Sequence, residues 1–166
     1  WGVRKSKSDS FEIYQIIEED SGSGEPSEDE DNTYAFALEN HLRDFLVKNL
    51  SSMLITEEPL YLYSDESGRD GREYPTDVGP IDILAVDAEG NFVVLELKVG
   101  QGPDRALGQI LRCMGWVKTQ LAGGKDVNGV IIANTVDNRL RYAAAVTPNI
   151  RLFEYKISFT IDEVHL

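Results

Sequence analysis

Three ionisable residues interrupt two otherwise apolar stretches of this sequence. Asp82 is the second residue of the segment IDILAV, and Glu96 and Lys98 lie at the end of the segment FVVLELK. Side chains alternate between the two faces of a β-strand, so Glu96 and Lys98 are expected to point to one face. Pairing of the two segments as a β-hairpin can bring Asp82 across from them. The pattern therefore predicts that two carboxylates and a lysine converge.

Such a group of side chains suits a hard divalent cation. Mg²⁺ and Mn²⁺ prefer oxygen ligands, and Mg²⁺ is usually held by one or two protein carboxylates together with waters and substrate phosphate oxygens. Asp82 and Glu96 are the expected metal ligands, with the backbone carbonyl of Leu97 as a further one. The cation would polarise a phosphodiester, and Lys98 would orient or deprotonate the attacking water or stabilise the developing charge. The expected chemistry is hydrolysis of a phosphodiester bond.

The simpler interpretation of the same residues is a structural ion pair. Lys98 can pair with Glu96 or with Asp82 on a solvated sheet face, and an isolated Glu-x-Lys occurs often by chance. The acidic residue placed before it across a hairpin favours the functional interpretation.

Hydrophobic periodicity places these segments within an α/β domain. Apolar residues at helical spacing predict an amphipathic helix over about residues 34–50. The segments 81–86 and 92–98 flank the turn sequence DAEGN and predict a β-hairpin. The remaining expected elements are extended segments at 60–63 and 72–76, a helix over 104–121 that ends before Gly123 and Gly124, a buried strand at 127–133, a helix at 138–145, and extended segments at 150–155 and 157–161.

The chain divides into three parts by composition. Residues 18–32 combine Gly, Ser and Pro with eight acidic residues and no large apolar side chain, so they are predicted to form a flexible acidic linker. Residues 1–17 precede it as a short segment of unassigned role, whose apolar part is residues 11–17. Residues 33–166 are long enough for one domain with a core.

Composition and charge restrict the classes of function. No apolar run approaches the roughly 18 residues that a membrane span needs, and no signal peptide is recognisable, so a cytoplasmic protein without membrane contact is expected. The single cysteine, Cys113, excludes an intrachain disulfide. The net charge of −13 opposes binding to nucleic acid, but residues 1–32 contribute −7 of it and residues 99–142 carry a local charge of +3.

The motif residues and their order resemble the PD-(D/E)XK nuclease superfamily, and within it the catalytic domain of NucS-type (EndoMS-like) endonucleases. The resemblance rests on the segments REYPTDVGPIDILAVDAEGNFVVLELKVG, ALGQILRCMGWV, VNGVIIAN and NIRLFEYKISF, and it covers most of residues 34–160. It implies a restriction-endonuclease-like α/β core, with a mixed central sheet flanked by helices in the order α-βββ-α-β-α-β.

The resemblance also implies roles for individual residues. Glu39 matches the accessory acidic residue of the family, Asp82 and Glu96 match its metal carboxylates, Lys98 its catalytic lysine, and Gln109 its helix glutamine. The implied cofactor is Mg²⁺ or Mn²⁺, the implied partner is DNA, and a homodimer is a further expectation.

Several other residues have two interpretations each. Trp116 could stack on a base, although a helical tryptophan beside apolar residues is more often part of the core. Arg72 and Tyr74 could line a substrate cleft or form a sheet edge, and Arg112 could contact phosphate. Cys113 is expected to pack rather than to act as a nucleophile, and His41 is expected on a surface.

Three hypotheses for function follow from these observations. The first is a Mg²⁺- or Mn²⁺-dependent endonuclease that hydrolyses DNA. The second is a catalytically silent module of the same fold that binds protein or nucleic acid, and the net charge of −13 favours a protein partner. The third keeps the nuclease chemistry and changes the substrate to RNA or to branched junctions.

Overall fold

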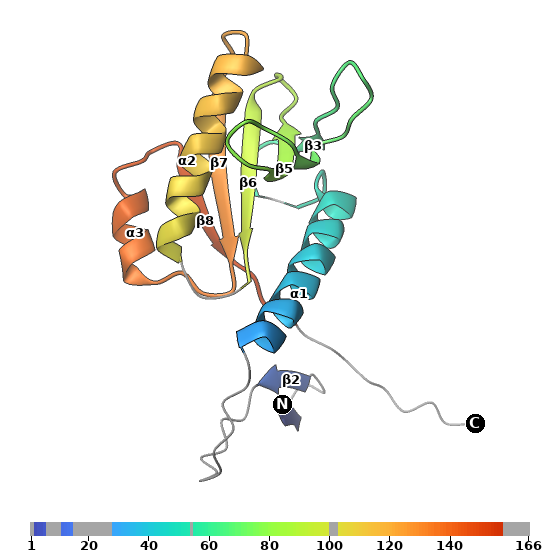
Figure 1. Cartoon of the computed structure of the whole chain (residues 1–166), viewed down its shortest axis with the longest axis vertical. Helices are drawn as coiled ribbons and strands as arrows, with labels where there is room; N and C mark the ends of the chain where they lie inside the picture. Colours follow the sequence, from blue (N-terminus) through green and yellow to red (C-terminus); the bar gives the residue numbers. More distant parts are fainter. Residues whose placement is uncertain (1, 6–10, 15–27, 54, 100–102, 158–166) are drawn as a thin grey trace, which may run out of the picture.

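A mixed β-sheet forms the centre of the domain (Figure 1). The computed structural model describes residues 2–5, 11–14, 28–53, 55–99 and 103–157, with side chains from residue 37 onward except at 103 and 104. The strand order is β3-β5-β6-β7-β8, and β4 also pairs with β5. The strands are β3 (Tyr61–Leu62), β4 (Arg72–Tyr74), β5 (Ile81–Val86), β6 (Phe92–Lys98), β7 (Val127–Ala133) and β8 (Ile150–Glu154).

The centre of this sheet combines one antiparallel hairpin with two parallel crossovers. β5 and β6 pair antiparallel, with Ile83 opposite Leu95 and Val86 opposite Phe92. β6, β7 and β8 run parallel, and the helices α2 (Pro103–Gln120) and α3 (Asn138–Ala144) connect them. The expected mixed sheet flanked by helices is confirmed, and the bounds of β5, β6 and β7 are those that the sequence predicts.

The edge of the sheet beside β5 is shared by two short strands. β3 pairs with the last residues of β5 and β4 pairs with its first residues, so together they occupy one position in the sheet. Between them the chain makes an excursion that a bridge between Ser64 and Asp70 closes. Gly71 ends the excursion, and a Cβ atom there would lie 2.0 Å from the carbonyl oxygen of Leu84. Only glycine permits this approach of the two strands.

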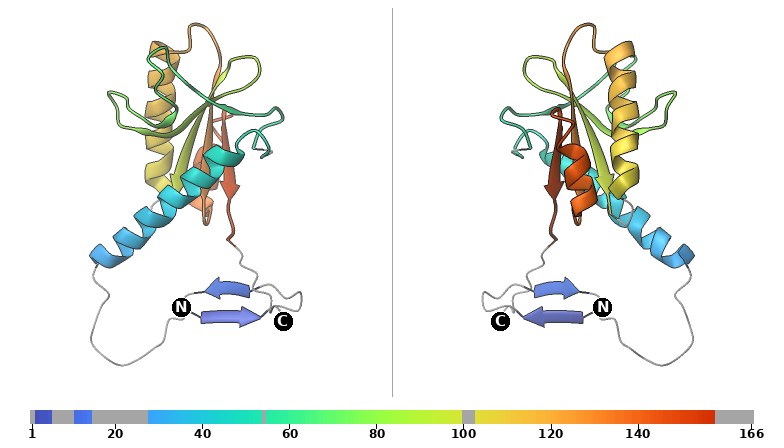
Figure 2. Two further views of the ribbon diagram at one scale, coloured as in Figure 1. Left: turned by 90° about the vertical axis from the view of Figure 1, so that its right-hand side faces the viewer. Right: turned by 90° about the vertical axis from the view of Figure 1, so that its left-hand side faces the viewer.

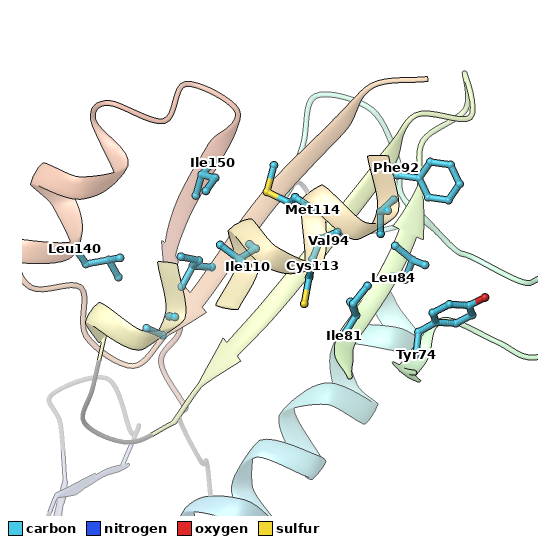
Figure 3. Packing of buried hydrophobic residues seen from close by; sticks show 14 of the residues in the cluster. Tyr74, Ile81, Leu84, Phe92, Val94, Ile110, Cys113, Met114, Leu140 and Ile150 are labelled. Atoms are coloured by element: carbon cyan, nitrogen blue, oxygen red, sulfur yellow. The ribbon is translucent and has the colours of Figure 1, made fainter. Parts of the chain in front are cut away.

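Helices cover both faces of the sheet (Figure 2). Leu46 of α1 (Glu28–Asn49) and Leu50, which directly follows the helix, pack against alternate residues of β5, β6 and β7, among them Ile83 and Leu95. α2 and α3 cover the opposite face, where the largest set of buried residues gathers (Figure 3): Tyr74, Ile81, Leu84, Phe92, Val94, Ile110, Cys113, Met114, Leu140 and Ile150 are among them.

Several boundaries differ from the sequence prediction. α1 begins at Glu28 rather than near residue 34, so residues 28–32 of the expected linker belong to a helix, while residues 18–27 lie outside the described part of the chain. The acidic sequence at this helix start is typical of the first helical turn, where negative charge is favourable. Of the extended segment expected at 157–161, Ile157 is not part of a strand, and residues 158–161 lie outside the described part of the chain.

Two features complete the description. β1 (Gly2–Lys5) and β2 (Phe11–Tyr14) pair antiparallel as a separate two-stranded sheet, in which β2 overlaps the apolar N-terminal segment and β1 was not predicted. Within the described residues, none of the helices has both the length and the apolar character needed to span a bilayer.

Candidate active site

The predicted carboxylates lie side by side where β5 begins and β6 ends. The pairing of the hairpin reaches Ile83 and Leu95, and Asp82 and Glu96 are the next residues in that register. Oδ2 of Asp82 accepts a hydrogen bond of 2.7 Å from the backbone N–H of Leu97. Asp82 is 8% exposed and Glu96 is 1% exposed, so the structure places both carboxylates in the interior. The predicted convergence is therefore present.

Lys98 follows Glu96 by two residues and lies on the same face of β6. Its Nζ lies 2.7 Å from Oε1 of Glu96, and the lysine side chain is 24% exposed. The Lys98 ammonium is thus the cationic partner of Oε1, and among the described residues no further donor reaches this buried oxygen. A carboxylate can accept about four contacts, so Glu96 keeps capacity as a ligand beside its pair with Lys98.

The charges at this site perturb one another strongly. Burial, and then the negative charge of Asp82, raises the pKa of Glu96 from 4.5 to about 7. Burial also raises the pKa of Asp82, although the hydrogen bond from Leu97 opposes it. Burial alone would lower the pKa of Lys98, but its ion pair with Glu96 outweighs this effect and raises it. The site thus holds more negative charge than its lysine can neutralise.

α1 brings Glu39 to the same group. The helix contacts both β5 and β6, and its N-terminal half passes the end of β6 in Figure 1. Burial and the charge of Asp82 raise the pKa of Glu39, while the charge of Lys98 lowers it. The accessory acid that the family resemblance implies is therefore an electrostatic neighbour of Asp82 and Lys98.

α2 covers the site from the other face. Leu95 and Leu97 face α1, so Glu96 between them points toward α2. Burial, and then the charge of Glu96, raises the pKa of Cys113 to about 11, which makes this thiol a packing group. Gln109 is partly buried one helical turn before Cys113, but within the described residues no hydrogen bond joins it to a carboxylate. Its role stays a prediction.

Arg72 and Tyr74, two of the four predicted substrate contacts, have different environments. Arg72 is half exposed and pairs with Asp70 at 3.2 Å and with Asp44 at 3.9 Å. Tyr74 is buried and its hydroxyl donates to Asp65 over 3.2 Å.

Trp116 is partly buried against the core, as the simpler interpretation expects. Its ring centroid lies 6.3 Å from that of Tyr74, and its indole N–H donates to Asp77 over 3.2 Å. Arg112 is exposed on α2, and His41 is exposed on α1 beside an apolar hollow between α1 and β8. As substrate contacts, these residues remain predictions.

Sequence reasoning missed two charged residues beside the site. Arg43 of α1 is buried, and Glu73 of β4 pairs with it across 3.2 Å. Arg43 lies one helical turn after Glu39, between the apolar positions Leu42 and Leu46, and this spacing was the available signal. Glu73 had no signal, because only the tertiary contact of β4 with α1 brings it there.

The atoms that could hold a hard cation are two carboxylates and one carbonyl. Within the described residues, no three side chains of Asp, Glu, His or Cys are grouped as a metal site. Two carboxylates are nevertheless the usual protein contribution to a Mg²⁺ site. The N–H and C=O of one residue point to the same side of a strand, so the carbonyl of Leu97 lies on the side from which its N–H meets Asp82. Oε1 of Glu96, which pairs with Lys98 and has no further donor among the described residues, also fits such a site.

Known proteins share this fold and parts of this sequence. Endonuclease NucS of Parafrankia sp. (strain EAN1pec) is 28% identical over 69% of this chain and 51% of its own length. Endonuclease NucS of Pyrococcus furiosus is 40% identical over 37% of this chain and 22% of its own length. The chain thus spans about half the length of the first of these relatives.

Two solved structures show the same fold at low sequence identity. An EndoMS–double-stranded DNA complex superposes with a TM-score of 0.55 at 20% identity, over 70% of this chain and 44% of the other. A repair endonuclease from Pyrococcus abyssi superposes with a TM-score of 0.50 at 22% identity, over 82% of this chain and 50% of the other. The family model for the endonuclease NucS C-terminal domain matches residues 38–150, more than half of the sequence. The chain belongs to the NucS C-terminal domain family, within the PD-(D/E)XK nucleases.

Proposed function

We propose that this domain is an endonuclease that hydrolyses DNA phosphodiester bonds with Mg²⁺ or Mn²⁺ held by Asp82, Glu96 and the carbonyl of Leu97. The observation that carries the proposal is the pair of buried carboxylates, Asp82 and Glu96, which share one lysine ammonium. A protein interior tolerates two such carboxylates when a cation compensates their charge. The surplus of negative charge therefore supports a divalent cation at this position.

Each nearby side chain has a function in this proposal. A bound cation would polarise the scissile phosphate and lower the pKa of a water molecule. Lys98 is restrained by Glu96 and remains 24% exposed on its side chain, so its ammonium can reach a solvent-borne nucleophile and orient it or stabilise the charge that develops on phosphate. Glu39 adds a carboxylate from α1 that can position a second water through a hydrogen bond.

The relatives support the choice of DNA as substrate. The similar proteins are named endonucleases, and one superposable structure is a complex with double-stranded DNA. Because the chain spans only about half of the relative from Parafrankia, the activity and the substrate of the whole relative are part of the proposal for this domain.

Cleavage assays with a matched variant test the proposal. Single-stranded, branched, mismatched and duplex DNA, and RNA of the same sequences, would be incubated with Mn²⁺ or Mg²⁺ and the wild-type chain, Asp82→Asn or Asp126→Asn. Asp126 is an exposed acid, with 84% of its side chain accessible, and it supplies the control for a change in net charge. Cleavage of DNA that depends on Asp82 and not on Asp126 is expected. Preferential cleavage of RNA would change the substrate, and equal cleavage by both variants would refute the site.

Calorimetry addresses the alternative of a silent binding module. The net charge of −13 favours a protein partner for such a module, because it disfavours contact with phosphates. Heat of binding from Mn²⁺ that Glu96→Gln abolishes supports the nuclease, whereas indifference of the wild-type chain to both metals favours the binding module. The homodimer expected from the family resemblance stays a prediction that sedimentation of the chain can test.

A further inference from the structure

Three charged side chains are buried within the described residues, and one of them has no function in the proposed reaction. Asp82 and Glu96 are the expected metal ligands, and the third is Arg43, which is 7% exposed. Transfer of a guanidinium from water into the interior is unfavourable unless anions or hydrogen-bond acceptors compensate it. Its partners therefore indicate what this cation is placed to bind.

Arg43 borders the candidate site and has an incomplete set of partners. Its Nη2 donates to Oδ1 of Asn40, and its Nη1 lies 3.2 Å from Oε1 of Glu73. Its positive charge counteracts the rise in the pKa of both Asp82 and Glu39, so the guanidinium is an electrostatic neighbour of the carboxylates. A guanidinium has five N–H donors in a planar fork, so these two partners leave room for another acceptor.

The partner of Arg43 is held in an unusual way. Glu73 has a φ of +41°, and it is the one non-glycine residue with positive φ in the described backbone. Most residues avoid this region because of steric contacts of their Cβ atom. The side chain of Glu73 is 59% exposed, and no hydrogen bond between the described atoms accompanies the ion pair. A carboxylate that could lie in water is thus directed at a buried guanidinium by a strained backbone.

We propose that Arg43 is a binding site for a phosphate group of the nucleic acid, and that Glu73 occupies it in the free protein as an anionic stand-in. Carboxylate and phosphate both present oxygen pairs that match the guanidinium fork. The exposure of Glu73 lets its side chain move into solvent when a phosphate arrives, and the buried guanidinium then keeps an anionic partner. The identity of the phosphate donor as DNA rests on the proposed function.

A structural tie between α1 and β4 is the competing explanation of the same pair. It predicts that removal of either partner weakens the domain and weakens binding. If Glu73 instead occupies a phosphate site, its removal frees the guanidinium and strengthens DNA binding. Removal of Arg43 removes the site and weakens DNA binding. The sign of the effect of Glu73→Gln therefore separates the two explanations.

Binding of a labelled DNA duplex in EDTA measures this sign without turnover or metal. Fluorescence anisotropy would compare the wild-type chain with Glu73→Gln, Arg43→Met, the double variant, and Glu89→Gln. Glu89 lies in the exposed turn between β5 and β6, at the end of the hairpin far from Asp82, and its substitution supplies the same change in net charge. Glu73→Gln is expected to lower the Kd about 5-fold and Arg43→Met to raise it by a similar factor.

The double variant and the control variant show whether Glu73 acts through Arg43. The double variant should bind as weakly as Arg43→Met, because Glu73 acts only through the guanidinium. The proposal is overturned if Glu73→Gln binds no tighter than Glu89→Gln, or if its gain persists without Arg43.

Melting temperatures in inorganic phosphate give a second measurement that does not need DNA binding. Phosphate should raise the melting temperature of Glu73→Gln more than that of the wild-type chain, and should raise that of Arg43→Met no more than chloride does at equal ionic strength. Equal responses of Glu73→Gln and the wild-type chain would overturn the proposal even if Arg43→Met failed to fold. Absence of DNA cleavage would refute the proposed function and leave both measurements interpretable.

Discussion

Replacement of Glu96 by glutamine is expected to stabilise the metal-free domain at alkaline pH. The ordinary pKa of a glutamate side chain is 4.5, and in the fold the pKa of Glu96 is about 7. The native state therefore binds more protons than the unfolded state between these two values, and the stability associated with the neutral carboxyl is lost as pH rises through about 7. A difference of about 2.5 pKa units corresponds to about 3 kcal/mol in the free energy of unfolding.

Urea denaturation in EDTA at about pH 4.5 and pH 8 is the assay for this difference. Glutamine resembles the protonated carboxyl in size and charge, so Glu96→Gln should match the wild-type chain at the lower pH and exceed it by about 3 kcal/mol at the higher pH. Glu58→Gln, at an exposed position, is the control and should change stability little at either pH.

Added Mn²⁺ provides a second comparison at pH 8. A cation that binds only the native state stabilises it in proportion to the logarithm of its concentration above the Kd. The wild-type chain should gain stability from Mn²⁺ and Glu96→Gln should not. If Glu96→Gln in EDTA at pH 8 is equal to or less stable than the wild-type chain, the reasoning that burial of this charge is unfavourable is refuted.

Three further measurements test other parts of the structure. Lys98→Met should lower the rate of DNA cleavage about 10²–10⁴-fold with little change in substrate Kd, which steady-state and binding assays would show, and a loss confined to binding would contradict its catalytic role. Gly71→Ala should destabilise the domain by about 2 kcal/mol or more, because its Cβ would lie 2.0 Å from the carbonyl oxygen of Leu84. Thermal denaturation measures this effect, and an unchanged melting temperature would show that the two strands can separate to admit the methyl group. Cys113, with a pKa of about 11, should resist thiol reagents at pH 8 in the native state and react on addition of urea, so rapid labelling without denaturant would show that its environment is open.

The central strands could be predicted because their buried apolar residues are consecutive in the sequence. β5 and β6 are apolar runs separated by a turn sequence, and every residue of Ile81–Ala85 is buried. Glu96 stood out because a charged residue in such a run requires compensation. The approach of Asp82 followed from hairpin pairing alone, without knowledge of the rest of the chain.

The remaining features depend on contacts between segments far apart in the sequence. The spacing of Arg43 indicates its place on the apolar face of the helix, but the pairing of its guanidinium with Glu73 depends on the packing of α1 beside β4. The positive φ of Glu73 is likewise imposed by tertiary structure, since glutamate has no preference for that region. The start of α1 differs from the prediction because low hydrophobicity indicates a linker, whereas an acidic first turn stabilises a helix without apolar residues.

The divided edge formed by β3 and β4 bears on whether the sheet can extend into a neighbouring molecule. A long regular edge strand exposes a row of backbone donors and acceptors that can recruit a strand of another molecule. Here β3 has two residues and β4 has three, and the excursion that ends at Gly71 separates them. This edge therefore has no continuous hydrogen-bonding ladder to which a strand of another molecule could be added. The excursion protects against intermolecular sheet extension, and its shortening into a straight strand would create a template for aggregation.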